Sequence, residues 1–167
     1  MPRIYLSLGS NVDPEANLRR AVASLREHYG ELDLSPVYRN AAVGFVGDDF
    51  LNLVAGLDSD DSIEAIAARI EAIHAAAGRD RSQARFSSRT LDIDLLTWGD
   101  CVTEDGPVVL PRADILRYAF VLKPLADLAP NDRHPQTGQS YAELWAEMAR
   151  EPNDLRRVDL DLAAAAA

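Results

Sequence analysis

Residues 89–94 read Arg-Thr-Leu-Asp-Ile-Asp, and this run is the starting point for predicting both fold and site. Successive side chains of a β-strand point to opposite faces, so Leu91 and Ile93 would face a core while Asp92 and Asp94 face the other side. The two carboxylates would lie about 7 Å apart at Cα and would repel each other unless a cation lies there. Mg²⁺ prefers oxygen ligands and commonly keeps phosphate oxygens and water beside one or two carboxylates. The run therefore predicts a strand that presents a metal-binding pair.

The segment before this pair is rich in arginine. Residues 79–89 hold one acid and four arginines, which are Arg79, Arg81, Arg85 and Arg89. Guanidinium groups bind phosphate oxygens in a bidentate manner. Arginines next to a carboxylate pair therefore suggest a metal-bound polyphosphate. The alternative interpretation is an edge strand with solvated acids beside a solvated basic loop.

Composition sets limits on the class of protein. The chain has 167 residues, of which 47% are hydrophobic and 26% charged, with a net charge of −10. These values predict a soluble globular protein with one domain over residues 1–162 and a frayed tail at 163–167. The acidic balance argues against a nucleic-acid partner, which would require a broad basic face.

The sequence lacks the residues that several kinds of binding site, and the segments for secretion or membrane insertion, require. Cys101 is the only cysteine, so an internal disulfide or a cysteine metal site is excluded. Lys123 is the only lysine and is not part of a P-loop, so any nucleotide must be held by arginine and metal. No apolar stretch is long enough for a signal peptide or a membrane span, and we therefore expect a cytoplasmic protein without a membrane partner.

Hydrophobic periodicity predicts an alternation of strands and helices. Strands are expected near 4–8, 32–39, 50–57 and 89–97, with Pro36 limiting the second to an edge or a bulge. One helix is expected from an Asp13 N-cap to Gly30, and a second from Asp61 or Ser62 to Gly78. This order predicts an α+β fold of ferredoxin-like type, a mostly antiparallel sheet with helices packed on one face.

The remainder of the chain has weaker patterns. We expect a short strand at 108–110, a helix at 120–128 that contains Pro124, and a last helix that begins at the capping box of Ser140 and Glu143. No repeat and no linker divides the chain.

A specific string and six supporting motifs follow one another along the chain. The string is Arg89-Thr-Leu-Asp-Ile-Asp-Leu-Leu. The supporting motifs are Leu8-Gly9-Ser10-Asn11, Tyr38-Arg39, Phe50-Leu51-Asn52, Gly78-Arg79-x-Arg81, Phe120-Val121-Leu122-x-Pro124-Leu125 and Ala129-Pro130. In this order they resemble the family of 6-hydroxymethyl-7,8-dihydropterin pyrophosphokinase over roughly residues 3–145.

The resemblance implies a reaction and its cofactors. Members of this family transfer the β,γ-pyrophosphoryl group of ATP, the co-substrate, to the hydroxymethyl oxygen of the pterin, release AMP, and use two Mg²⁺. Asp92 and Asp94 would then be the metal ligands. Arg79 and Arg81 would lie in a loop that closes over the triphosphate, and Arg89 would contact its oxygens. The remaining nucleotide contacts would be Arg112 and Ile93.

The resemblance also implies a pterin pocket. Phe50 would stack on the pterin and Asn52 would hydrogen-bond its polar edge, while Asn11 and Phe120 would lie close by. The pocket wall would be built by Asn40, Ala41 and Val43. Other interpretations remain open: Phe50 can be a core residue, and Asn11 can cap the turn after the first strand. We expect small-molecule partners only, pterin and ATP, and a monomer.

Six positions depart from the family pattern. His74 stands where the family has a glutamate on the pterin or metal side, and a histidine at this place is otherwise a satisfied structural residue. Phe86 replaces a loop tryptophan, Ser87-Ser88 replace Gly-Pro, Arg112 replaces a nucleotide-contacting histidine, and Tyr118 replaces an arginine. These departures leave two alternatives, a divergent paralogue that acts on a related pterin and a non-catalytic pterin- or nucleotide-binding module.

Overall fold

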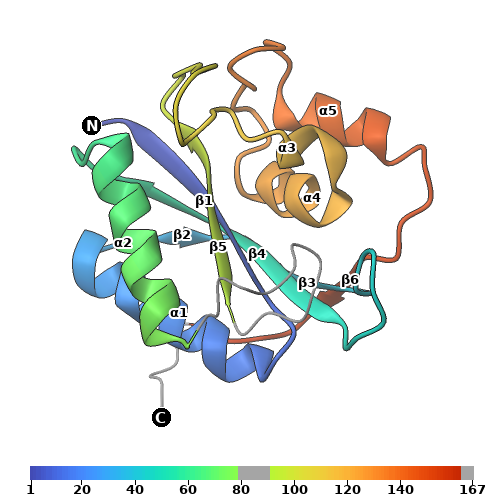
Figure 1. The fold of residues 1–167 in the computed structure, drawn as a ribbon. Coiled ribbons are helices and arrows are strands. Elements are labelled where there is room, and N and C mark those ends of the chain that lie inside the picture. The colour runs from blue at the N-terminus through green and yellow to red at the C-terminus, as the bar shows by residue number, and fades with distance from the viewer. Residues whose placement is uncertain (79–90, 163–167) are drawn as a thin grey trace.

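The computed structural model describes residues 1–78 and 91–162. Its centre is an antiparallel sheet whose strands lie in the order β5-β1-β4-β3-β6, with the short β2 paired to β4 (Figure 1). The strands are β1 (Arg3–Ser10), β2 (Asp33–Leu34), β3 (Val37–Asn40), β4 (Phe50–Asp58), β5 (Asp92–Trp98) and β6 (Arg156–Val158). The α+β class predicted from the sequence is confirmed.

One face of the sheet is covered by α1 (Pro14–Tyr29) and α2 (Ile63–Ala76) (Figure 1). Alternate residues of β1 and β4 point toward these helices and meet their apolar stripes, as the periodicity predicted. The fully buried side chains of this core include Leu6, Leu53, Leu18 and Ile66.

The opposite face carries a second core. It is covered by α4 (Ala119–Leu128) and α5 (Tyr141–Met148), preceded by the short α3 (Asp114–Arg117) (Figure 1). Tyr5, Val54 and Leu96 of the sheet pack against these helices. The expectation that all helices pack on one face of the sheet is therefore wrong. The second face is polar at one end of its strands but apolar at the other, and the apolar end binds a second helical layer.

Strand β5 contributes to both cores and carries one β-bulge opposite β1. The pairing of β5 with β1 shifts register between Tyr5 and Leu6, and the consecutive residues Leu95 and Leu96 are both buried, one in each core. An extra residue in one strand breaks the strict alternation of faces. The alternating pattern of the two aspartates lies before the bulge and is preserved.

Several local expectations are corrected by the structure. The expected strand at 32–39 is divided at Pro36 into β2 and β3, because proline has no N–H to donate to the ladder. Asp13 precedes α1 with φ 45° but makes no capping hydrogen bond with its side chain. The 108–110 segment forms only an isolated bridge from Leu110 to Thr103. Strand β5 begins at Asp92, and residues 89 and 90 of the expected strand lie outside the described residues.

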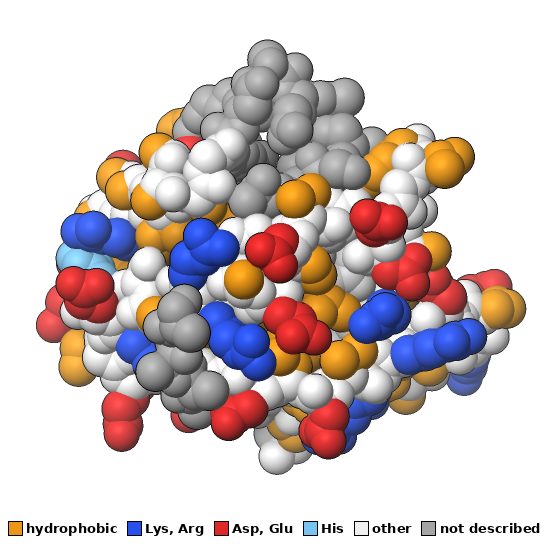
Figure 2. All heavy atoms as spheres, turned by 90° about the horizontal axis from the view of Figure 1, so that it is seen from below, with side chains coloured by type: hydrophobic (Ala, Val, Ile, Leu, Met, Phe, Trp, Pro, Cys, Tyr) orange, Lys and Arg blue, Asp and Glu red, His pale blue; other side chains and the backbone are white. Residues whose placement is uncertain are grey.

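Other local expectations are confirmed. Ser62 caps α2 by accepting from the backbone N–H of Ala65, and Ser140 and Glu143 form the capping box of α5. Pro124 lies within α4, as predicted. None of the helices in the described ranges has both the length and the apolar content required to cross a bilayer. On the face shown in Figure 2, basic and acidic side chains are interspersed.

Two tyrosines join the sheet to the second helical layer. Tyr38 donates a hydrogen bond to Asp127 of α4, and Tyr5 donates one to Asp132. Burial raises the pKa of each phenol to about 12, and the neighbouring carboxylate adds to the shift. These phenols therefore stay neutral in the folded protein at pH values where they would ionise in the unfolded chain.

This shift predicts an alkaline loss of stability. Since the two phenols ionise near pH 10 when unfolded and near pH 12 when folded, their contribution is fully present below pH 10 and is lost as the pH rises to 12. Thermal unfolding followed between pH 9 and 12 should show a steeper fall of Tm in the wild type than in a Tyr5→Phe, Tyr38→Phe double variant. Equal slopes would contradict the prediction.

Candidate active site

The two aspartates lie on the face of the sheet that carries α4 and α5. Asp92 pairs with Gly9 and Asp94 with Ser7, and these residues pair in turn with Asn52 and Val54 of β4. Directly paired residues share a face of an antiparallel sheet. Asp92 and Asp94 are partly exposed, whereas Leu91 and Ile93 are buried. The predicted division of this strand into an apolar and an acidic face is confirmed.

Among the described residues, Arg112 is the cation beside this pair. Its Nη2 lies 3.5 Å from Oδ1 of Asp94 and its Nε lies 3.0 Å from Oδ2 of Asp114. The backbone N–H of Arg112 donates to the carbonyl of Leu96 at 2.9 Å, which fixes the residue against β5. Burial disfavours the charged guanidinium, but Asp94, Asp114 and Asp92 outweigh burial and raise the pKa of Arg112. The side chain is therefore a permanent positive charge at the edge of the carboxylate pair.

A cavity of about 620 Å³ adjoins Arg112. Its lining also includes Asp114 and Arg117 of α3 and the buried His134. Desolvation lowers the pKa of His134. Its Nδ1 accepts hydrogen bonds from the backbone N–H groups of Gln136 and Thr137. The imidazole is therefore neutral and stabilises the turn that these residues form. Arg112 can thus reach a ligand at the carboxylates and a ligand in this cavity.

Three predicted arginines, Arg79, Arg81 and Arg89, lie outside the described residues, as does Phe86. In the described part of the chain no three acidic, histidine or cysteine side chains converge as a metal cage. The two carboxylates are therefore the protein oxygen ligands that the described residues offer at this place, and the other ligands of a metal would come from substrate and water.

Buried amides continue the site across β4 and β3. Nδ2 of Asn52 donates to Oδ1 of Asn40, and Nδ2 of Asn40 donates to the carbonyl of Ala41 at 3.0 Å. Asn11 donates through Nδ2 to the carbonyl of Asp48 at 3.0 Å and so holds the loop before β4. The predicted polar residues Asn11, Asn40 and Asn52 are all buried on this side of the sheet. A buried amide without a partner is costly, and this chain of bonds fixes their orientation.

The apolar residues predicted for the pocket have different environments. Phe50 is half-buried and meets the edge of Phe45 at 6.3 Å between ring centroids. Phe120 stacks on Tyr118 at 4.9 Å, on the helix that packs against β4. Val43 is 41% exposed. Of these three side chains, that of Phe50 lies beside the amides, because Phe50 is the register partner of Asn40.

The backbone of Ala41 is already engaged. Its N–H donates to Oδ2 of Asp154 at 2.7 Å, a residue from the segment before β6. Asp154 was not singled out by sequence reasoning, because it belongs to no motif and lies 113 positions away in the chain. A pterin contact through this N–H would require Asp154 to move.

His74 does not face the carboxylate side of the sheet. It is buried on α2, and its Nε2 accepts the backbone N–H of Ile93 at 2.8 Å. Of the two interpretations of this position, a pterin-side residue and a satisfied structural histidine, the structure supports the second. Its place on an apolar helix stripe favoured a structural role, and the structure supplies the partner.

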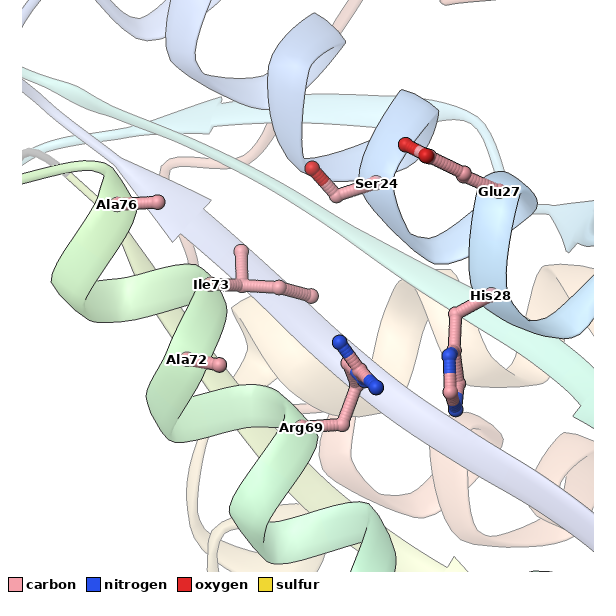
Figure 3. A pocket seen from close by; sticks show the side chains of 7 residues that line it. All are labelled: Ser24, Glu27, His28, Arg69, Ala72, Ile73 and Ala76. Carbon is pink, nitrogen blue, oxygen red and sulfur yellow. The ribbon is translucent and has the colours of Figure 1, made fainter.

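A second cleft, of about 380 Å³, lies between α1 and α2 on the other side of the sheet (Figure 3). The side chains of Arg69 and His28 extend into the space between the helices in this view, and Glu27 and Ser24 line the α1 side. None of the predicted site residues lines this cleft. The chemistry of the carboxylates is therefore separate from it.

Comparisons with known proteins bear on the family of this chain. Residues 5–130 match the family model of 7,8-dihydro-6-hydroxymethylpterin-pyrophosphokinase. A 2-amino-4-hydroxy-6-hydroxymethyldihydropteridine pyrophosphokinase of Methylorubrum extorquens is 34% identical over 163 residues, which cover 95% of this chain and 100% of that protein. One of Pseudomonas aeruginosa is 35% identical, over 86% of this chain and 90% of that protein.

A solved structure extends the comparison to the fold. The wild-type HPPK-DHPS of Plasmodium falciparum matches with a TM-score of 0.68 at 12% identity, over 89% of this chain. The match spans 45% of the Plasmodium chain, so this likeness bears on the fold of one part of it. With a family model that covers most of the sequence and relatives matched over nearly their full length, the chain belongs to the 7,8-dihydro-6-hydroxymethylpterin-pyrophosphokinase family.

Proposed function

We propose that Asp92 and Asp94 hold two Mg²⁺ ions while this enzyme transfers pyrophosphate from ATP to 6-hydroxymethyl-7,8-dihydropterin, the activity of its family in folate biosynthesis. The observation that carries the proposal is the carboxylate pair on one face of β5, with Arg112 3.5 Å from Asp94. Oxygen ligands of this kind suit Mg²⁺, and a two-carboxylate site leaves room for phosphate oxygens. Bound there, the ions would neutralise the triphosphate and lower the pKa of the attacking hydroxyl.

The side chains of the site bind and orient the reactants. In the transfer the hydroxymethyl oxygen forms a bond to the β-phosphorus, the bond from the β-phosphorus to the oxygen of the α-phosphate breaks, AMP leaves, and the hydroxyl proton passes to solvent. Phosphoryl-type transfer depends mainly on positioning and on charge stabilisation. Arg112 would move from Asp94 to a phosphate oxygen, and Arg79, Arg81 and Arg89 would complete the cationic shell. A contact of Ile93 with the nucleotide would use its backbone carbonyl, because its side chain is buried in the core and its N–H is bound by His74.

The pterin would lie against the amides of the sheet. Phe50 offers a half-buried ring for stacking, and Asn52, oriented by Asn40, offers an amide for the polar edge of the substrate. Asn11, Ala41 and Val43 would form the adjoining wall, and Phe120 the side nearest α4. Gly9 lies between the pterin side and the metal side of the site, because it pairs with Asn52 on β4 and with Asp92 on β5.

Gly9 tests the pterin side of this proposal. A Cβ on Gly9 would lie 2.5 Å from Oδ1 of Asn52, so the amide must move in a Gly9→Ala variant. Loss of an oriented amide costs about 1–3 kcal/mol, which corresponds to roughly a 5- to 150-fold weaker binding of the pterin. Calorimetric titration with 6-hydroxymethyl-pterin measures the effect.

Gly56→Ala is the matched control. Its Cβ would meet Nη2 of Arg3 at 2.7 Å, a similar clash on the same sheet but at the other end of β4. We expect both variants to lose thermal stability and only Gly9→Ala to lose pterin affinity. A pterin affinity that falls equally in both variants would remove Asn52 from the site.

The whole chain acts as one unit in this proposal. The carboxylates, Arg112 and the amides all come from one sheet and its connections, so we propose that residues 1–162 form one catalytic domain that works as a monomer. Because the reaction consumes ATP, we place it in the cytoplasm. Light scattering of the purified protein measures the oligomeric state.

One assay tests the reaction and its alternatives. Purified protein with MgATP and 6-hydroxymethyl-7,8-dihydropterin should release AMP and yield a pyrophosphorylated pterin, both scored by mass spectrometry. Release of AMP with a different 6-substituted pterin alone would favour the divergent paralogue. Binding of both ligands without AMP would favour a binding module and would contradict the proposal.

A further inference from the structure

Within residues 1–78 and 91–162, β5 lies at one end of the strand order and its only strand partner is β1. The N–H and C=O groups on its outer edge therefore need partners from outside the sheet. Ile93 occupies the position between the two aspartates, and its N–H points away from β1 to the side chain of His74. The carbonyl of Leu96, further along the same strand, accepts from the backbone N–H of Arg112.

The contact with His74 is short and shielded from water. The distance from the Ile93 nitrogen to Nε2 of His74 is 2.8 Å, and His74 is only 3% exposed. Because Nε2 accepts, the proton of the ring resides on Nδ1, which lies 3.6 Å from Oε1 of Glu71. The ring is thus held with its lone pair directed at one peptide group of β5.

That peptide group lies at the centre of the acidic run. The side chain of Ile93 is buried in the core under α2, and its N–H is bound to the same helix, so the residue is fixed both at its side chain and at its backbone. The orientation of its backbone sets the directions in which Asp92 and Asp94 leave the strand. Metal sites tolerate deviations of only about 0.5 Å or 10–20° in their ligands.

We propose that His74 is a positioning residue for the metal site: its Nε2 holds the Ile93 peptide so that Asp92 and Asp94 present their carboxylates to the same divalent ions. The inference rests on the proposed metal role of this pair. His74 reaches the ligands through the backbone, from the opposite face of the sheet. Groups that orient metal ligands in this way change metal affinity when they are removed.

The test compares His74→Leu, which has no acceptor, with His74→Gln. Oε1 of glutamine lies as many bonds from Cβ as Nε2 of histidine, so it can accept the same N–H. We measure the dissociation constant of Mn²⁺, alone and with α,β-methylene-ATP, by electron paramagnetic resonance. His74→Leu should bind Mn²⁺ about 10- to 100-fold more weakly, and His74→Gln should restore most of this loss.

Ile73→Ala separates positioning from stability. It removes buried surface from the neighbouring residue of α2 but leaves the Ile93 N–H bonded. It should lower Tm and leave the affinity for Mn²⁺ unchanged. If His74→Leu does not fold, His74→Asn, whose acceptor is one bond shorter, takes its place and should also weaken Mn²⁺ binding.

Direct observation of the bond completes the test. In uniformly ¹⁵N-labelled protein, a coupling between the Ile93 nitrogen and Nε2 of His74 should be visible across the hydrogen bond and should be lost in His74→Leu. Wild-type affinity for Mn²⁺ in His74→Leu would overturn the inference. Failure of the wild type itself to bind Mn²⁺ would instead overturn the metal role of the aspartates, and the inference with it.

Discussion

Replacing either Asp92 or Asp94 with asparagine should reduce the turnover of the enzyme by about 10²-fold or more, since each change removes an anionic oxygen ligand from a charge-stabilising site. Asparagine keeps the size of the side chain, so the strand and both cores are preserved. Thermal unfolding should stay within about 4 °C of the wild type, because both carboxylates are partly exposed. Release of AMP at saturating Mg²⁺ measures the loss.

Asp58→Asn is the control for this pair. Asp58 ends β4 of the same sheet, and its carboxylate lies 3.4 Å from Nη1 of Arg3, far from the site in the strand register. It removes the same charge and should leave turnover unchanged. Were either site variant to retain more than a tenth of wild-type turnover, the two-metal interpretation would fail.

Replacing Arg112 with leucine should have opposite effects on metal binding and on catalysis. The guanidinium is a cation beside Asp94 and competes with a divalent ion for the carboxylate. Its removal should tighten Mn²⁺ binding to the free protein by about 3- to 10-fold. At the same time kcat/KM for MgATP should fall by about 10- to 100-fold, because a charged hydrogen bond to phosphate is lost.

One control variant and two contrary outcomes decide the role of Arg112. Arg20→Leu removes an exposed arginine of α1 and should change neither quantity, which controls for net charge. If Arg112→Leu weakened Mn²⁺ binding, Arg112 would support the metal through Asp94 rather than compete with it. Unchanged kcat/KM for MgATP would remove Arg112 from the nucleotide site.

The acidic strand and the helices under it could be predicted because their signals are local. The alternation around Asp92 and the stripe that contains Ile66 each follow from the period of one element. The second helical layer was only partly predicted, since Val54 and Tyr5 are isolated apolar residues on a face that is otherwise polar. The short β6 has three residues, too few for a periodic pattern.

The contacts that complete the site could not be read from the sequence. The pairing of Arg112 with Asp94, of Asp154 with the Ala41 N–H, and of His74 with the Ile93 N–H all join residues far apart in the chain. Such contacts depend on how the loops and helices return to the sheet, and neither spacing nor composition encodes them. The family motifs indicated the reaction, while the partner of each side chain required the fold.

The ends of the sheet also bear on how the protein behaves at high concentration. An open strand edge is a template for pairing with another chain and a common route to aggregation. At β5 the outer N–H of Ile93 and the carbonyl of Leu96 are occupied by residues of the same chain. At the other end β6 is only three residues long and carries Arg156 and Arg157. Edge-to-edge association is thereby opposed at both ends, so folded molecules can remain separate in a crowded solution.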